Sequence, residues 1–291
     1  MAYYISQLIN GICQGSIYAL MAIGFSVVMG VVGLVTFTHG EVIMLGAFAS
    51  YYAFAMFGNH LLVGILASFG ASFLIGVVIY KVCYERFFDA PHHISLLCTI
   101  GMSMLLKNLA QILFGPNFKP LLEVLPNRFY GVGSVGISLV QLTVIATVIS
   151  LSLLLFLFFN RTRWGVQLRA VCQDRKAASL MGINVKLTSM LGNCIGCGLG
   201  GVAGMLLAIY YQTLIATMGG PAGMKAFSAS VLGGMTNVPS AALGGVVLGV
   251  VENLGITFTN ASFRDVFAFL FLLGVLILRP EGFARKLGNR S

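Results

Sequence analysis

The sequence consists mainly of continuous apolar runs, most of them about 20 residues long. They lie at about 5–32, 41–57, 61–83, 94–114, 138–159, 188–211, 240–258 and 264–279. A helix of about 20 residues crosses a hydrocarbon core of about 30 Å, whereas a closed barrel needs shorter strands of alternating polarity. The runs therefore predict an all-α polytopic membrane protein with about 8–9 transmembrane helices.

The composition agrees with a membrane protein and excludes a soluble globule. Hydrophobic residues make up 58% of the chain and charged residues 9%, and the mean hydropathy is +0.95. The net charge of +9 comes from Lys and Arg beside the apolar runs, where membrane orientation explains them without a nucleic-acid partner. The six cysteines fall mostly inside the runs, including the pair Cys194 and Cys197, so we expect no disulfide framework and no metal site.

Basic loops predict the orientation of the spans. Positive charges gather at 81–86, at 161–186 and in the tail at 279–290, and these loops should lie in the cytoplasm. The N-terminus is then external, and a cytoplasmic C-terminus requires nine crossings. The ninth is the stretch 214–235, which contains Gly-Gly-Pro at 219–221 and is typical of a broken or re-entrant helix.

Two polar, glycine-containing breaks interrupt the apolar runs, one at 35–41 and one at 233–240. Interruptions at corresponding places indicate an internal repeat whose discontinuous helices line a substrate path near the middle of the bilayer. For the second break, an ordinary loop between spans is an equally good interpretation. The expected path residues are Phe37, Thr38, His39, Gly40, Glu41 and Asn237.

Ionisable side chains inside apolar stretches are costly and mark candidate functional sites. His39 and Glu41 can partner each other at a cavity wall, or can form a solvated loop end at the membrane surface. Glu252 lies deep in a predicted helix, and Lys107 is similarly embedded and is its candidate partner. Lys225 is expected to extend towards the headgroups.

Glycines recur at helical spacing in the second half of the chain. Four of them, four residues apart, form a stripe on one helix face: Gly192, Gly196, Gly200 and Gly204. Gly245 and Gly249 repeat this spacing near the C-terminus. Such stripes allow another helix backbone to approach closely, so we interpret them as packing devices.

The basic segment 160–186 contains a helical pattern. Asp174, Ala177, Ala178 and Met181 are spaced to share one face, and Gly182 is suited to end the helix. This face could enter a groove of another protein, or the helix could lie on the membrane with its basic residues towards lipid headgroups. The residue pattern alone leaves both interpretations open.

Several motifs together resemble the branched-chain amino acid ABC transporter permeases. They lie at 8–20, 37–41, 169–174, 177–184, 223–227, 231–234 and 279–282, and so extend over nearly the whole chain. Thr36 and Thr38 depart from the Asn and Ala that the family often has. The resemblance implies a single transmembrane permease domain, 1–291, of the ABC importer type.

The resemblance also implies how such a chain works. Segment 160–186 would contain the cytoplasmic coupling segment, which contacts the ATPase through Gln173, Asp174, Ala177, Ala178, Met181 and Gly182. The partners would be a second homologous permease, two cytoplasmic ATP-binding subunits, an extracytoplasmic solute-binding protein and membrane lipid. The location would be a bacterial inner membrane, with the C-terminus inside, and transport would proceed by alternating access.

The expected substrate is a branched-chain or other hydrophobic amino acid, and a urea or short-amide permease is the close alternative. The chain has no Gly-x-x-x-x-Gly-Lys-Ser/Thr loop, so we expect a transporter subunit without its own ATPase activity, catalytic residues or cofactor. Glu252 and Lys107 favour a second alternative, an ion-coupled secondary transporter. A third class, an intramembrane enzyme, lacks any His-Glu-x-x-His or Ser/His arrangement.

Overall fold

The computed structural model describes residues 2–87, 91–121, 124, 129–132, 135–258 and 263–278. The basic tail after residue 278, expected in the cytoplasm, lies outside the described residues. The described elements are mostly helical, and they comprise α1 (Ala2–Val32), α2 (His39–Phe57), α3 (Leu61–Ile79), the π-helical turn η1 (Tyr80–Glu85), α4 (His92–Phe114), α5 (Leu139–Arg161), α6 (Arg163–Gln173), α7 (Arg175–Leu180), α8 (Val185–Tyr211), α9 (Gly219–Gly233), α10 (Val238–Phe258) and α11 (Arg264–Leu278).

The predicted all-α membrane fold is confirmed. Within the described residues, seven helices are long and apolar enough to cross a membrane: α1, α2, α3 with η1, α4, α5, α8 and α10. The predicted last span, α11, and the predicted broken stretch, α9, have 15 residues each. At 1.5 Å per residue, α9 falls short of a hydrocarbon core of about 30 Å, and so do the 15 residues of α11 that the structure describes.

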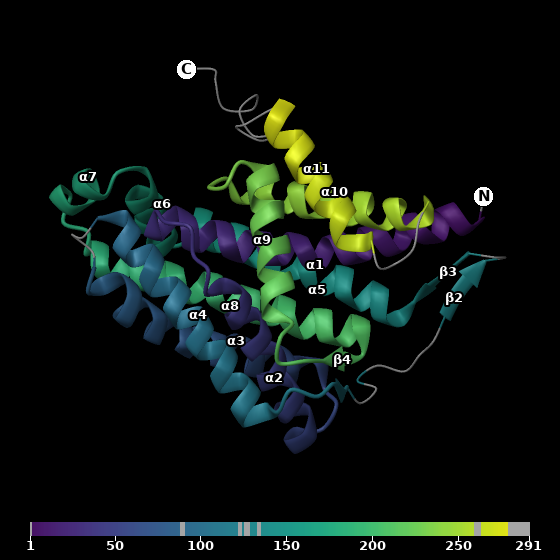
Figure 1. Cartoon of the computed structure of the whole chain (residues 1–291). Helices are drawn as coiled ribbons and strands as arrows, with labels where there is room; N and C mark the ends of the chain where they lie inside the picture. Colours follow the sequence, from purple (N-terminus) through teal and green to yellow (C-terminus); the bar gives the residue numbers. More distant parts are fainter. Residues whose placement is uncertain are drawn as a thin grey trace.

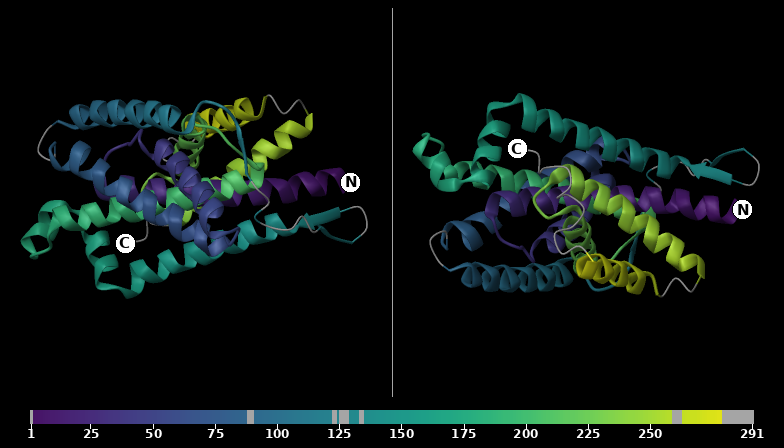
Figure 2. Two further views of the ribbon diagram at one scale, coloured as in Figure 1. Left: turned by 90° about the horizontal axis from the view of Figure 1, so that it is seen from below. Right: turned by 90° about the horizontal axis from the view of Figure 1, so that it is seen from above.

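Helices α1 and α8 form the centre of the bundle. The apolar window of α1 is 89% buried and that of α8 is 78% buried, against 11% for α4 and 22% for α5. Helix α1 packs against α8 and α10, and α8 also packs against α2 and α3. Figure 2 shows α4 and α5 on opposite sides of this centre.

The glycine stripes are packing devices, as predicted. A Cβ added to Gly204 would lie 2.0 Å from the Ile43 carbonyl oxygen, and one on Gly196 would lie 2.6 Å from the Gly24 carbonyl oxygen. Gly245 and Gly249 allow a similar approach of α10 to α1. Because lipid tails are as apolar as the helices, close backbone contact of this kind is a main source of attraction between spans.

The two ends of the bundle carry different structures (Figure 1). The N-terminus lies at one end beside the hairpin of β2 (Phe129–Val132) and β3 (Val135–Ser138), whereas α6 and α7 project from the opposite end. A second small sheet pairs β1 (Lys119–Pro120) with β4 (Thr213–Leu214) in antiparallel register. It fixes the loop after α4 to the connection between α8 and α9.

Candidate functional site

The first turns of α2 and α9 cross in backbone contact. A Cβ on Gly40 would lie 2.2 Å from the Gly219 carbonyl oxygen and 3.0 Å from the Gly223 Cα. The break at 35–41 therefore meets the start of α9. The sequence predicts instead that the break at 35–41 corresponds to the break at 233–240 in an internal repeat, and this second break forms the turn between α9 and α10.

His39 and Glu41 are buried at this crossing, with exposed fractions of 2% and 4%, so the interpretation as a solvated loop end is wrong. Their contacts differ. The His39 Nε2 atom lies 3.3 Å from the Met21 carbonyl oxygen, and its ring meets Phe25 edge to face. Glu41 accepts a hydrogen bond from Ser103 at 3.5 Å.

The second carboxylate oxygen of Glu41 borders the N-terminus of α9. A Cβ on Gly219 would lie 2.6 Å from this oxygen, Oε2. The N-terminal end of a helix carries partial positive charge, so it stabilises a carboxylate placed there. Beside this cluster, Thr38 is buried at the start of α2, whereas Phe37 is 47% exposed.

Asn237 lies in a different cavity from residues 37–41. It occupies the turn between α9 and α10, and its Oδ1 accepts from the Ser240 amide at 3.4 Å. The cavity, about 690 Å³, is lined by α1, α5, α6 and this turn, and it includes Arg169 and Cys172. The structure thus divides the expected path residues between two places.

A buried ionic network lies among α1, α9, α10 and α11. Glu252, which is fully buried, accepts from Lys225 at 3.0 Å and has Arg264 Nε at 3.2 Å. Lys225 also pairs with Asp265 at 2.9 Å. These two cations and two anions balance, which lowers the cost of placing charge in the bundle.

The expected Lys107–Glu252 pair is wrong. Helix α4 packs against α2 and η1, whereas α10 packs against α1, α9 and α11, so the two side chains lie in different parts of the bundle. Lys107 is on the exposed face of α4, within electrostatic reach of Glu41. The expectation that Lys225 extends towards the headgroups is also wrong, because this residue is 8% exposed and points to Glu252.

Amide and hydroxyl groups complete the network. Gln14 donates to Glu252 at 3.2 Å and to the Tyr211 hydroxyl at 2.7 Å. Tyr18 donates to Glu252 at 3.2 Å, and Asn253 donates to the Gln14 side-chain oxygen at 2.8 Å. In the described part of the chain, Glu252 Oε2 has no hydrogen-bond partner, and no cluster of His, Cys, Asp or Glu suits a metal ion.

Most members of this network were missed by sequence reasoning, although two signals were available. Gln14 and Tyr18 stand four residues apart in the first apolar run, so they mark one polar strip on a helix that is otherwise apolar. Arg264 and Asp265 begin the last run with adjacent opposite charges. Neither signal reveals that these groups converge on Glu252.

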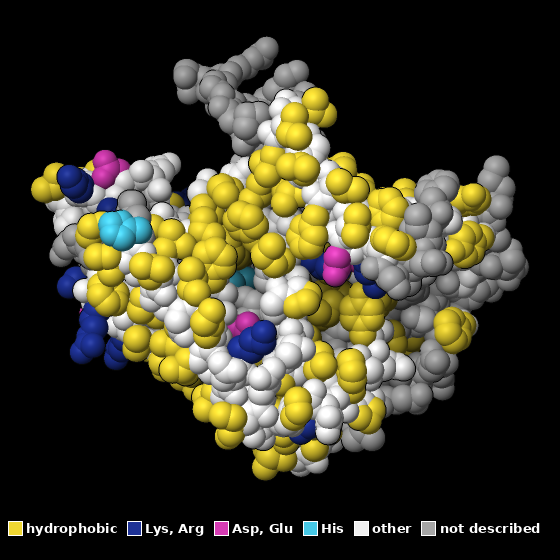
Figure 3. Space-filling model, in the orientation of Figure 1, with side chains coloured by type: hydrophobic (Ala, Val, Ile, Leu, Met, Phe, Trp, Pro, Cys, Tyr) yellow, Lys and Arg dark blue, Asp and Glu magenta, His cyan; other side chains and the backbone are white. Residues whose placement is uncertain are grey.

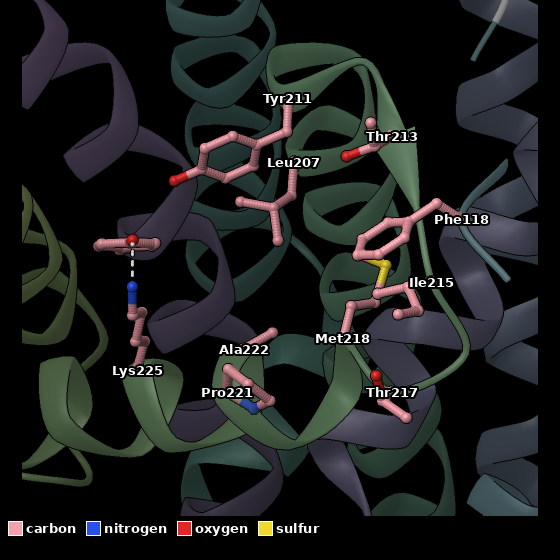
Figure 4. A pocket seen from close by; sticks show the side chains of 11 residues that line it. Phe118, Leu207, Tyr211, Thr213, Ile215, Thr217, Met218, Pro221, Ala222 and Lys225 are labelled. Atoms are coloured by element: carbon pink, nitrogen blue, oxygen red, sulfur yellow. Dashed lines mark hydrogen bonds between the residues drawn. The ribbon is translucent and has the colours of Figure 1, made fainter. Parts of the chain in front are cut away.

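An open pocket of about 400 Å³ adjoins the network, and we call it the outer pocket (Figure 4). It is lined by Tyr18, Phe118, Leu207, Tyr211, Thr213, Ile215, Thr217, Met218, Pro221, Ala222 and Lys225. Figure 4 shows Lys225 on one side, donating to the Tyr18 hydroxyl at 3.0 Å, and the apolar side chains across from it. Phe118 and Thr213 belong to the segments joined by β1 and β4.

The surface over α4, α9 and α11 is largely apolar, and basic and acidic side chains adjoin each other within it (Figure 3). Helix α4 is the least buried of the candidate spans, yet it carries Lys107 and Asn108 on its exposed side. A lysine facing lipid near the middle of a span costs about 2.5–3.5 kcal/mol. This face is therefore poorly suited to lipid alone.

The basic segment forms two short helices where the sequence predicts one helical face. Asp174 is extended (φ −153°) and caps α7, accepting from the Lys176 amide at 2.8 Å and the Ala177 amide at 3.1 Å. Ala178, expected on the outward face, is buried. Gly182 ends the helix as predicted, with φ +82°.

The tip of α7 is strongly exposed and apolar. Leu180 is 89% exposed and Met181 is 83% exposed. Ala177, Asp174 and Gln173 are exposed beside them. The exposed surface of this segment thus contains every residue expected to contact the ATPase except Ala178. It also contains Leu180, which was not among the expected residues.

Comparisons with known proteins place the chain among transport proteins. The family model described as "Branched-chain amino acid transport system / permease component" matches residues 7–276. The high-affinity branched-chain amino acid transport system permease protein BraD of Pseudomonas aeruginosa is 37% identical over 96% of this chain and 95% of its own length. LivH of Escherichia coli, a permease protein of the same description, is 35% identical with the same coverage of both chains.

One more distant relative extends the same pattern. A probable branched-chain amino acid transport permease protein LivH of Methanocaldococcus jannaschii is 25% identical over 94% of this chain and 90% of its own length. Among solved structures, PsaBC from Streptococcus pneumoniae in complex with Fab aligns with a TM-score of 0.47 and 15% identity, over 99% of this chain and 94% of that one. That likeness is below the level at which a shared fold is inferred.

Proposed function

The chain belongs to the family of permease components of branched-chain amino acid transport systems, and on that premise we propose that it is the membrane subunit of an ATP-driven importer. It moves branched-chain or other hydrophobic amino acids into the cell by alternating access. The observation that carries this proposal is the pair α6 and α7, which projects from one end of the bundle with an apolar tip.

This tip suits contact with a cytoplasmic ATP-binding subunit. Leu180 and Met181 are too exposed to serve the fold, and exposed apolar groups rimmed by polar residues are typical of protein contacts. We assign the coupling contact to Gln173, Asp174, Ala177, Leu180, Met181 and Gly182. Ala178 is buried, and α7 contacts both α6 and α8, so force applied at the tip can pass to α8.

The solute path runs along the face that contains Glu41, Ser103 and Lys107. Polar groups on this face of α4 are better matched to water and to a second permease subunit than to lipid. The start of α2, Phe37 to Glu41, forms the middle of the path. Asn237 belongs to the cavity near α6, on the cytoplasmic side.

The proposed assembly contains this chain, a second homologous permease, two ATP-binding subunits and an extracytoplasmic solute-binding protein. It lies in a bacterial inner membrane with α6, α7 and the C-terminus inside. The basic residues of the α6–α7 segment support this orientation through the positive-inside rule.

A solute panel tests the substrate. ATPase activity of the reconstituted complex is measured with leucine, isoleucine, valine, urea and acetamide, each presented with the binding protein. Stimulation by the three amino acids supports the proposal. Stimulation by urea or acetamide alone would assign the chain to the urea and short-amide alternative.

One observation favours a second candidate function, an ion-coupled secondary transporter. The buried pair Lys225 and Glu252 is the kind of intramembrane charge found on ion and proton paths. This candidate predicts uptake by the chain alone under an ion gradient, without ATP-binding subunits.

A further inference from the structure

The outer pocket has two chemically different walls. Leu207, Ile215 and Met218 form an apolar wall, and Lys225 with the Tyr18 hydroxyl forms a polar one. Its volume, about 400 Å³, is within the range of about 300–1,000 Å³ that is usual for small-molecule sites. A pocket of this kind suits a small amphipathic molecule with an apolar side chain and a charged end.

The three acceptors around the Lys225 ammonium are unequally held. Glu252 and Tyr18 are buried in the network and cannot leave without exposing other partners. The Asp265 side chain is 55% exposed, and an ion pair at such a position contributes little stability. Asp265 is therefore the acceptor that another carboxylate can replace.

Asp265 is not a lining residue of the outer pocket, but its carboxylate lies 2.9 Å from the Nζ atom of Lys225, which is one, so a zwitterion inserted between the two groups would leave the net charge unchanged. Its carboxylate takes the place of Asp265 on the Lys225 ammonium, and its ammonium group pairs with the released Asp265. The network stays balanced, because one cation and one anion enter together. A carboxylic acid without the ammonium group would instead add an uncompensated negative charge beside Asp265 and Glu252.

We propose that the outer pocket binds the transported amino acid, by insertion of its zwitterion into the Lys225–Asp265 ion pair and of its side chain against Leu207, Ile215 and Met218. This inference rests on the proposed function and names the groups that select the substrate. Asp265 is the second residue of α11, so occupancy of the pocket also changes what holds the start of this helix.

Cysteine protection tests the proposal in the purified complex in nanodiscs. Thr217, which lines the pocket, is replaced by Cys, and the exposed native Cys172 is replaced by Ser. The rate of reaction with a hydrophilic methanethiosulfonate is measured. Leucine at ten times its dissociation constant should slow labelling about tenfold, since about one site in eleven stays free. His60→Cys, in the exposed turn between α2 and α3, is the control and should not be protected.

Two analogues and one variant identify the groups involved. Leucinamide, which lacks the carboxylate, and 4-methylpentanoate, which lacks the ammonium group, should protect poorly. In Asp265→Asn, which removes the carboxylate that competes for the Lys225 ammonium, 4-methylpentanoate should protect better than in the parent. Equal protection by leucine and leucinamide, or no protection by leucine, would overturn the proposal.

A parallel measurement separates this inference from the proposed function. Leucine-stimulated ATPase activity is recorded for the parent complex in the same nanodiscs. Stimulation without protection of Thr217→Cys refutes the outer pocket and leaves the importer standing. Protection without stimulation supports the pocket and refutes the ATP-driven importer.

Discussion

Replacing Gly40 by alanine is expected to disrupt the crossing of α2 and α9. The new Cβ would lie 2.2 Å from the Gly219 carbonyl oxygen, whereas Cβ contacts under 3.0 Å are essentially never found. The backbones must separate by about 0.8 Å, the difference between these distances, because a carbonyl oxygen cannot rotate away as a side chain can. Overpacking of this kind costs about 1–3 kcal/mol, and alanine gains at most about 1 kcal/mol over glycine in a helix, so the expected net loss of stability is up to about 2 kcal/mol.

The measurement is unfolding of the purified chain in mixed detergent micelles, followed by its circular dichroism. Gly70→Ala in α3 and Gly101→Ala in α4 are matched controls, because a Cβ at either position meets nothing within 4 Å. Both controls should unfold at or above the parent midpoint, and Gly40→Ala should unfold earlier. If Gly40→Ala is as stable as the controls, the inferred backbone contact between α2 and α9 is refuted.

Because Gly40→Ala disturbs the fold, Glu41→Gln is the variant that tests the solute path. It should lower uptake and leave assembly of the complex intact.

Three further predictions concern other parts of the chain. Asp174→Ala removes the cap of α7, at a local cost of about 0.5–2 kcal/mol, and should lower the amount of solute moved per ATP hydrolysed; an unchanged ratio would return this segment to a lipid-facing role. Lys225→Met leaves the buried Glu252 carboxylate short of a cation and should cost about 3–5 kcal/mol in thermal unfolding, and Lys225→Met with Glu252→Gln should recover part of this loss. If the double variant is less stable than Lys225→Met, the pairing is refuted. Cys172 is exposed as a residue, but its Sγ atom lies close to Gly30 of α1, and desolvation there raises the pKa of the thiol to about 11. Its maleimide labelling rate should therefore rise about tenfold per pH unit between pH 7 and 9, and a plateau in that range would contradict the assignment.

The features that could be predicted from the sequence depend on neighbours along one helix. Apolar length locates the spans, and the spacing of Gly196 and Gly204 identifies a close-packing face on α8. Gly182 ends its helix because a positive φ suits glycine. Each of these properties is fixed within a few turns of the chain.

The features that could not be predicted depend on which helices meet. Periodicity assigns a side chain to a helix face but does not identify the helix opposite that face. The sequence therefore suggests Lys107 as the partner of Glu252, whereas the cations beside Glu252 come from α9 and α11. The depth of the stretch 214–235 in the membrane could not be assigned from its apolar character, because the helix that it forms, α9, is too short to span the bilayer. The break between α6 and α7 has a local signal, because Asp174 is a favoured N-cap residue. The apolar spacing continues across Asp174, however, so it predicts one helical face there.

The proposed function requires that this chain transports amino acids only as part of an ATP-driven assembly. The most direct test is leucine uptake into proteoliposomes that contain the chain alone, or the chain with its second permease, ATP-binding subunits and binding protein. The proposed function predicts accumulation only in the complete assembly, only with ATP inside the compartment that α6 and α7 face, and without dependence on an ion gradient. Accumulation of leucine by the chain alone, driven by a proton or sodium gradient without ATP, would contradict it.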